Sequence, residues 1–65
     1  MKLWVSFHVD NDAFRDEEGG LNYAEIDAVL DQAKEKAREL TDARWKISLI
    51  DSNGNTVGNV STSGF

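Results

Sequence analysis

An Asn53-Gly54 pair between two alternating apolar runs is the feature that most restricts how this chain can fold. A two-residue type I′ turn needs positive φ at both central positions, and Asn-Gly meets that need well. We therefore expect a β-hairpin over residues 44–61. Centring the turn on this pair sets the cross-strand partners as Ser52–Asn55, Ile50–Val57, Leu49–Gly58 and Ile47–Val60.

Residues 2–9 are the other strand candidate, because apolar and polar residues alternate along them. One face of this strand would carry Leu3, Val5, Phe7 and Val9. The opposite face would carry Trp4, Ser6 and His8. Residues 10–21 are polar and acidic and include two consecutive glycines, so they predict a loop.

Residues 22–41 predict an amphipathic helix. Asn22 is a good N-cap, and Glu25 is placed to reach back to the backbone N–H of the cap. Leu21 and Ile26 occupy the positions of a hydrophobic staple. An apolar stripe at helical spacing follows, formed by Ile26, Leu30, Ala33, Ala37 and Leu40.

These elements predict an α+β fold of the β-α-β-β type, in which one amphipathic helix packs on one face of a three-stranded sheet. We expect residues 1–65 to form a single domain. The third strand is polar and contains glycine, which favours an edge position and places the second strand in the centre. The first two strands would then be parallel and joined by a right-handed crossover. The alternative order puts the third strand in the centre.

One helix covers one face of such a sheet and leaves the other face open. The hairpin residues expected in the core are Trp45, Ile47, Leu49 and Val60. The apolar residues expected on the open face are Trp4, Ile50 and Val57. An exposed apolar patch on a small domain often marks an interface, so this face is a candidate for self-association or for a partner.

The net charge of −5 is unevenly distributed, because residues 1–31 hold eight of the twelve acidic residues and two of the seven basic ones. This polarity predicts a protein partner with a basic surface and disfavours nucleic acid and anionic membranes. Phe14, within the acidic segment, either tucks under the loop or anchors the partner. The acidic residues expected to bind the partner are Asp10, Asp12, Asp16, Glu17 and Glu18.

The residue types needed for catalysis or metal binding are scarce. The chain has no cysteine and a single histidine, His8, so thiolate sites and zinc clusters are excluded. Ser6 lies about 7 Å from His8 along the strand, too far for a direct hydrogen bond. Neither the loop from Asp10 nor the segment from Asp51 has the glycine and bidentate glutamate of an EF-hand loop. We expect no catalytic, cofactor-binding or metal-binding residue, and no enzymatic activity.

Two segments carry a resemblance: Asp10-Asn11-Asp12-Ala13-Phe14, and Asp51-Ser52-Asn53-Gly54-Asn55-Thr56-Val57-Gly58. With a helix between them, the chain resembles small uncharacterised proteins encoded by phages and prophages of actinobacteria. The resemblance implies a short phage gene product that acts in the cytoplasm of a bacterial host. The expected function is non-catalytic binding of a host or defence protein. The alternative is a structural homo-oligomeric module, such as a homodimer, that assembles through the open sheet face.

Overall fold

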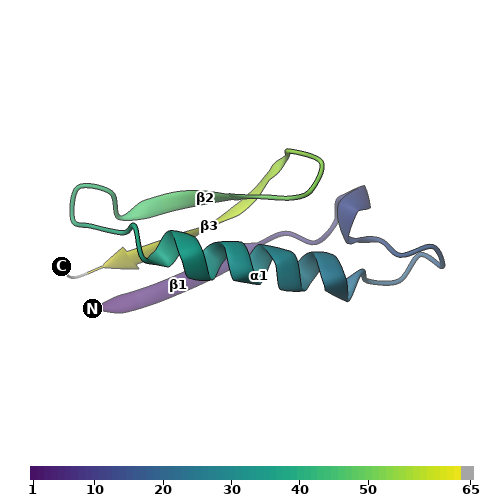
Figure 1. Cartoon of the computed structure of the whole chain (residues 1–65), viewed down its shortest axis with the longest axis horizontal. Coiled ribbons are helices and arrows are strands. Elements are labelled where there is room, and N and C mark those ends of the chain that lie inside the picture. The colour runs from purple at the N-terminus through teal and green to yellow at the C-terminus, as the bar shows by residue number, and fades with distance from the viewer. Residues whose placement is uncertain (64–65) are drawn as a thin grey trace.

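The structure is a computed structural model that describes residues 1–63. Within them, three strands form one antiparallel sheet, and a helix lies across one face of it (Figure 1). This arrangement confirms the α+β fold class. The elements are β1 (Lys2–Phe7), a 3₁₀ turn η1 (Asp12–Phe14), α1 (Tyr23–Ala37), β2 (Lys46–Ile50) and β3 (Thr56–Ser63).

The strand order is β1-β3-β2, so the favoured order with the second strand in the centre is wrong and the alternative is correct. β3 pairs antiparallel with both neighbours, and β1 and β2 are not adjacent, so no parallel crossover exists between them. The polar residues of β3 suggested an edge. Asn59 and Ser61 instead belong to the face that the helix leaves open, while Val60 and Thr62 are buried on the other face.

Gly58 fits the central position of β3 because it has no side chain. It lies opposite Phe7 of β1 and Leu49 of β2. A Cβ atom on Gly58 would overlap the carbonyl oxygen of Ser6 and lie 2.5 Å from the Cα atom of Phe7. Gly58 therefore does not mark an edge strand: it lets β1 and β3 approach each other closely.

The hairpin forms where expected, but its turn is not type I′. Gly54 has a φ of 85°, whereas no non-glycine residue among those described has a positive φ. The Gly54 N–H donates to the Asp51 carbonyl at 3.0 Å, and the Asp51 N–H donates to the Asn55 carbonyl at 2.9 Å. This pattern makes a three-residue loop. A bulge after Leu49 then restores the expected register further along the strands.

The bulge changes which residues of the hairpin are buried. The expected pairs Leu49–Gly58 and Ile47–Val60 are confirmed, but Ile50 lies opposite Thr56 rather than Val57. Val57 is 4% exposed and belongs to the core, so its expected place on the open face is wrong. The extra residue turns the Val57 side chain toward the helix.

The core lies between α1 and the β2–β3 half of the sheet. The expected core residues Ile47, Leu49 and Val60 are confirmed. Trp45 is wrong: it is 54% exposed, because it precedes β2 and α1 ends at Ala37 instead of Thr41. The buried apolar side chains among residues 1–63 are Phe14, Val29, Ala33, Ile47, Leu49, Val57 and Val60.

Candidate protein-binding surfaces

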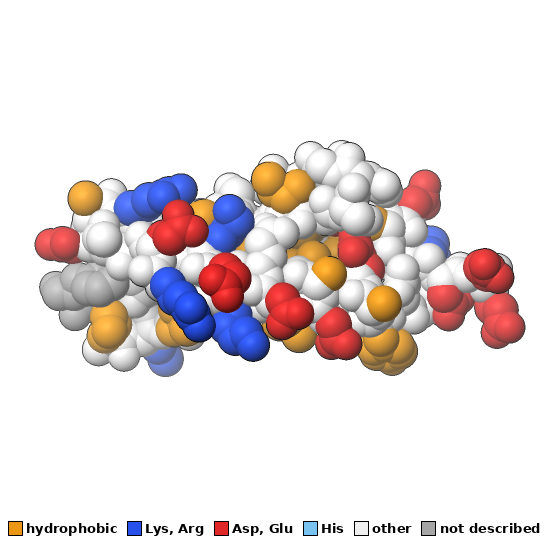
Figure 2. All heavy atoms as spheres, viewed as in Figure 1, with side chains coloured by type: hydrophobic (Ala, Val, Ile, Leu, Met, Phe, Trp, Pro, Cys, Tyr) orange, Lys and Arg blue, Asp and Glu red, His pale blue; other side chains and the backbone are white. Residues whose placement is uncertain are grey.

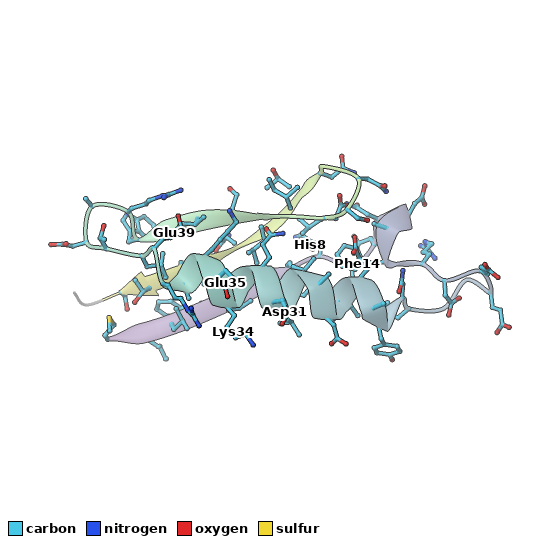
Figure 3. All side chains as sticks on the ribbon, viewed as in Figure 1. His8, Phe14, Asp31, Lys34, Glu35 and Glu39 are labelled. Carbon is cyan, nitrogen blue, oxygen red and sulfur yellow. The ribbon has the colours of Figure 1, made fainter. Side chains whose placement is uncertain are left out.

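The acidic loop, residues 10–21, is fastened to the body of the protein by Phe14. This side chain is fully buried, and its ring centroid lies 6.0 Å from that of Phe7. Its carbonyl accepts a 2.7 Å hydrogen bond from the Asn22 N–H, just before the helix starts. Phe14 therefore tucks under the loop and is not available to a partner, which corrects its place among the candidate binding residues (Figure 3).

Asp16 organises the tip of the acidic loop. Its Oδ1 accepts hydrogen bonds from the backbone N–H groups of Glu18 at 2.9 Å and of Gly20 at 2.7 Å. Gly19 completes the turn with a φ of 84°, a conformation that glycine adopts without strain. Asp16 is thus a structural residue as well as a negative charge. Glu17 and Glu18 stay exposed at the tip that it shapes.

Unpaired carboxylates gather at the loop end of the molecule, whereas the ion pairs lie elsewhere (Figure 2). Among the described residues, no acid of the acidic loop takes part in an ion pair. The ion pairs are Lys34–Asp31 at 3.8 Å, Arg38–Glu35 at 4.0 Å and Arg44–Glu39 at 3.2 Å. The molecule measures 43 × 19 × 16 Å, so its negative charge is concentrated toward one end of a long body.

Asp51 joins the acidic loop to the hairpin, a role that the sequence pattern did not reveal. The residue is 5% exposed. Its carboxylate accepts hydrogen bonds from the Asn11 amide at 2.9 Å and from the N–H groups of Asn53 and Asn55 at 3.0 and 2.9 Å. The Asn11 bond, followed by those within the turn, holds the pKa of Asp51 below its ordinary value of 3.8, although burial opposes this shift. The Asp-Ser-Asn-Gly segment does favour an aspartate-capped turn, but nothing in it indicates a bond to residue 11.

The helix start is bonded to the same turn. Asn22 is the N-cap as expected, because its side chain accepts a hydrogen bond from the Glu25 N–H at 3.3 Å. The expected return contact from Glu25 is not formed. Glu25 is only 8% exposed, and its carboxylate instead accepts a 2.7 Å hydrogen bond from the Ser52 N–H. Loop, helix and hairpin therefore meet in one polar network at this end of the molecule.

The open face, defined as the sheet face away from α1, is more polar than expected. Trp4 is 46% exposed and Ile50 is 41% exposed. Trp4 lies in a row with Ser61 and Lys46, and the next row toward Ile50 consists of Ser6, Asn59 and Ser48. This polar row separates the two apolar side chains, and Val57 is buried, so the three residues form no continuous patch.

The single histidine, His8, is exposed directly after β1. No three histidine, cysteine, aspartate or glutamate side chains of the described part of the chain gather as metal ligands. Residues 1–63 also contain no helix with the length and apolar character needed to cross a membrane.

Comparisons with family models, curated proteins and solved structures found no match for this chain.

Proposed function

We propose that this protein is a non-catalytic binding protein whose acidic loop docks on a basic surface of another protein. One observation carries the proposal: the acidic loop has exposed carboxylates that form no ion pair among the described residues, and the body of the protein already holds this loop in place. The exposed carboxylates are those of Asp10, Asp12, Asp16, Glu17 and Glu18. The buried Phe14 and the Asn11–Asp51 hydrogen bond fasten the loop beneath them.

A loop that is ordered before binding loses little conformational entropy when a partner arrives. Its negative field also steers a positively charged partner and raises the association rate, an effect that salt weakens. The same field repels phosphate backbones and anionic lipids. These considerations support a protein partner rather than nucleic acid or a membrane.

The class of partner rests on the resemblance to small actinobacterial phage and prophage proteins. That resemblance supports a host or defence protein in the bacterial cytoplasm as the target. The alternative, self-assembly through the open face, has weaker support, because polar residues separate Trp4 from Ile50 and Val57 lies in the core.

The decisive experiment compares two triple charge reversals. The first changes Asp12, Glu17 and Glu18 to Lys, and leaves Asp16 intact because it shapes the loop. The second changes Glu35, Glu39 and Asp42 to Lys, which alters the net charge equally but away from the acidic loop. Both variants should keep the native circular dichroism spectrum, since all six residues are exposed. The control also loses the Arg38–Glu35 and Arg44–Glu39 ion pairs, but these are exposed and contribute little to stability.

Each immobilised protein is used to capture proteins from an actinobacterial lysate, and the captured protein is purified and titrated calorimetrically. We expect the loop variant to lose at least tenfold in affinity and the control to stay within threefold of the wild type. The wild-type affinity should fall as salt is raised from 50 to 300 mM. Equal binding by the two variants would refute the acidic loop as the docking surface.

A further inference from the structure

The two edge strands of the sheet differ in how far their outer backbone groups are protected. β1 and β2 are both edge strands, and an edge strand presents unpaired N–H and C=O groups that can template another strand. On β2, the Gln32 side chain closes part of this edge. Its amide donates to the Ile50 carbonyl at 2.8 Å, and its oxygen accepts from the Ile50 N–H at 2.8 Å.

β1 has no comparable protection among the described residues. It contains no proline, and its register with β3 runs from Lys2 to Phe7 without a bulge. Its one charged residue, Lys2, lies at its first position. Leu3, Trp4 and Val5 are 56%, 46% and 42% exposed, so apolar side chains stand free on both faces of the strand.

The free backbone groups of β1 can be assigned to particular residues. The His8 N–H donates to the Val57 carbonyl at 2.9 Å, so the backbone groups of His8 point toward β3. Successive residues of a strand direct these groups to opposite edges. The N–H and C=O groups of Leu3, Val5 and Phe7 therefore point away from the sheet and are available to another strand.

The helix leaves β1 largely uncovered as well. α1 packs over β2 and β3, with Gln32 turned toward the β2 edge. At about 100° per residue, Leu30 lies on the opposite side of the helix from Gln32, toward β1, and it is 46% exposed. An apolar depression of about 230 Å³ lies where the start of β1, the end of β3 and the end of α1 meet. It is lined by Met1, Leu3, Ala37, Leu40 and Thr62. In Figure 2, orange side chains at the lower edge of the molecule alternate with blue and red ones.

We propose that a second copy of this chain pairs antiparallel with β1, which produces a two-fold symmetric dimer with a continuous six-stranded sheet. The two-fold axis would run perpendicular to the sheet, so both helices lie on the same face. The outward backbone groups of Leu3 and Val5 would bond to those of the second copy. The side chains that become buried are Met1, Leu3, Val5 and Leu30, with the two Trp4 rings near each other on the open face.

The exposed apolar side chains are concentrated where the second copy would pack. A standard interface covers about 800 Å² of each partner, or about a sixth of the 4546 Å² that this chain exposes. Five of the nine exposed large apolar side chains of the described residues lie along β1 and its flank: Met1, Leu3, Trp4, Val5 and Leu30. A chain of this size without disulfides also has a marginal core, which association through this edge would extend.

The charge distribution is compatible with two copies. β1 carries no acidic residue, so the seam would bury no carboxylate of β1. The N-terminus of β1 lies at the end of the molecule away from the acidic loop (Figure 1). Antiparallel pairing therefore sends the two acidic loops to opposite ends of the dimer, where their like charges stay apart.

Sedimentation equilibrium of the full chain from 5 to 500 μM tests the proposal. We expect the wild type to change from 7.2 kDa to twice that mass as concentration rises. Leu3→Lys places a charge in the seam and should weaken association at least tenfold. The control Ser48→Lys adds the same charge to the open face and should associate like the wild type. Thermal melts of both variants at 5 μM confirm that each is folded.

A backbone substitution gives a second and independent measurement. Leu3→Pro removes an N–H that points outward and makes no hydrogen bond within one copy, so the monomer should stay folded while association falls at least tenfold. Amide exchange of Leu3 and Val5 in the wild type should slow with rising concentration. A wild type that stays at 7.2 kDa at 500 μM, or a dimer that Leu3→Lys and Leu3→Pro leave intact, would overturn the proposal.

Discussion

The two ends of this molecule are stabilised in different ways. At the loop end, hydrogen bonds and one buried ring hold the acidic loop, the helix start and the hairpin turn together. The hydrogen bonds involve Asn11, Asp51 and Glu25, and the ring is that of Phe14. At the opposite end the helix stops early, and Leu3 and Trp45 remain more than half exposed. The comparison shows that the exposed charges rest on the better-fastened part of the fold, while the apolar surface is exposed where packing ends.

The largest expected effect is that of Phe14→Ala, because this ring fastens the acidic loop. Removing a fully buried phenylalanine destabilises a protein by about 3–5 kcal/mol. Urea denaturation followed by circular dichroism measures the loss. If the variant is unfolded in water, Phe14→Leu should give a folded protein with an intermediate loss. A loss below about 1 kcal/mol for Phe14→Ala would show that the loop end is not fastened in this way.

Asp51 should make the loop end sensitive to acid. Its pKa is held below 3.8 in the folded protein, chiefly by the Asn11 amide. A group with a lowered folded pKa contributes stability that is fully present above its unfolded pKa and disappears as the pH falls through the folded value. Below about pH 4, stability should therefore fall more steeply for the wild type than for Asp51→Asn. Thermal melts from pH 2.5 to 7 test this, and parallel curves for the two proteins would contradict it.

Gln32→Ala should have a smaller effect, because its two hydrogen bonds to Ile50 lie near the surface. We expect a loss of about 1 kcal/mol and faster amide exchange at Ile50. The matched control is Glu35→Ala, a substitution on the exposed side of the same helix that should stay within about 0.5 kcal/mol of the wild type. Equal effects of the two substitutions would show that Gln32 does not protect the β2 edge.

The smallest effect is expected for Trp45→Ala at the other end of the molecule. This tryptophan is 54% exposed, and Lys46 Nζ lies 6.0 Å from its ring centroid. The loss should be below about 1 kcal/mol, several times smaller than for Phe14→Ala. Comparable losses for these two aromatic residues would remove the contrast between the ends of the molecule.

The elements themselves could be predicted well from local pattern. Alternation located the strands, the Asn22 cap located the helix start, and the Asn53-Gly54 pair located the hairpin. Two details failed because they depend on contacts between distant segments. The bond from Asn11 to Asp51 accompanies a three-residue turn, and the bulge that follows moves Val57 into the core. The open face consequently lost one of its three expected binding residues.

The sequence by itself determined that this chain makes an antiparallel hairpin, one amphipathic helix and a preceding strand, and that its acids gather between the first strand and the helix. These are properties of neighbouring residues, so local chemistry suffices. Only the tertiary structure decided that β3 is central, that Phe14 is buried and that β1 keeps an open edge. These outcomes depend on which segments approach closely enough to exclude water. Gly58, which reads in the sequence as a weak point of a strand, allows the central approach because it places no side chain between β1 and β3.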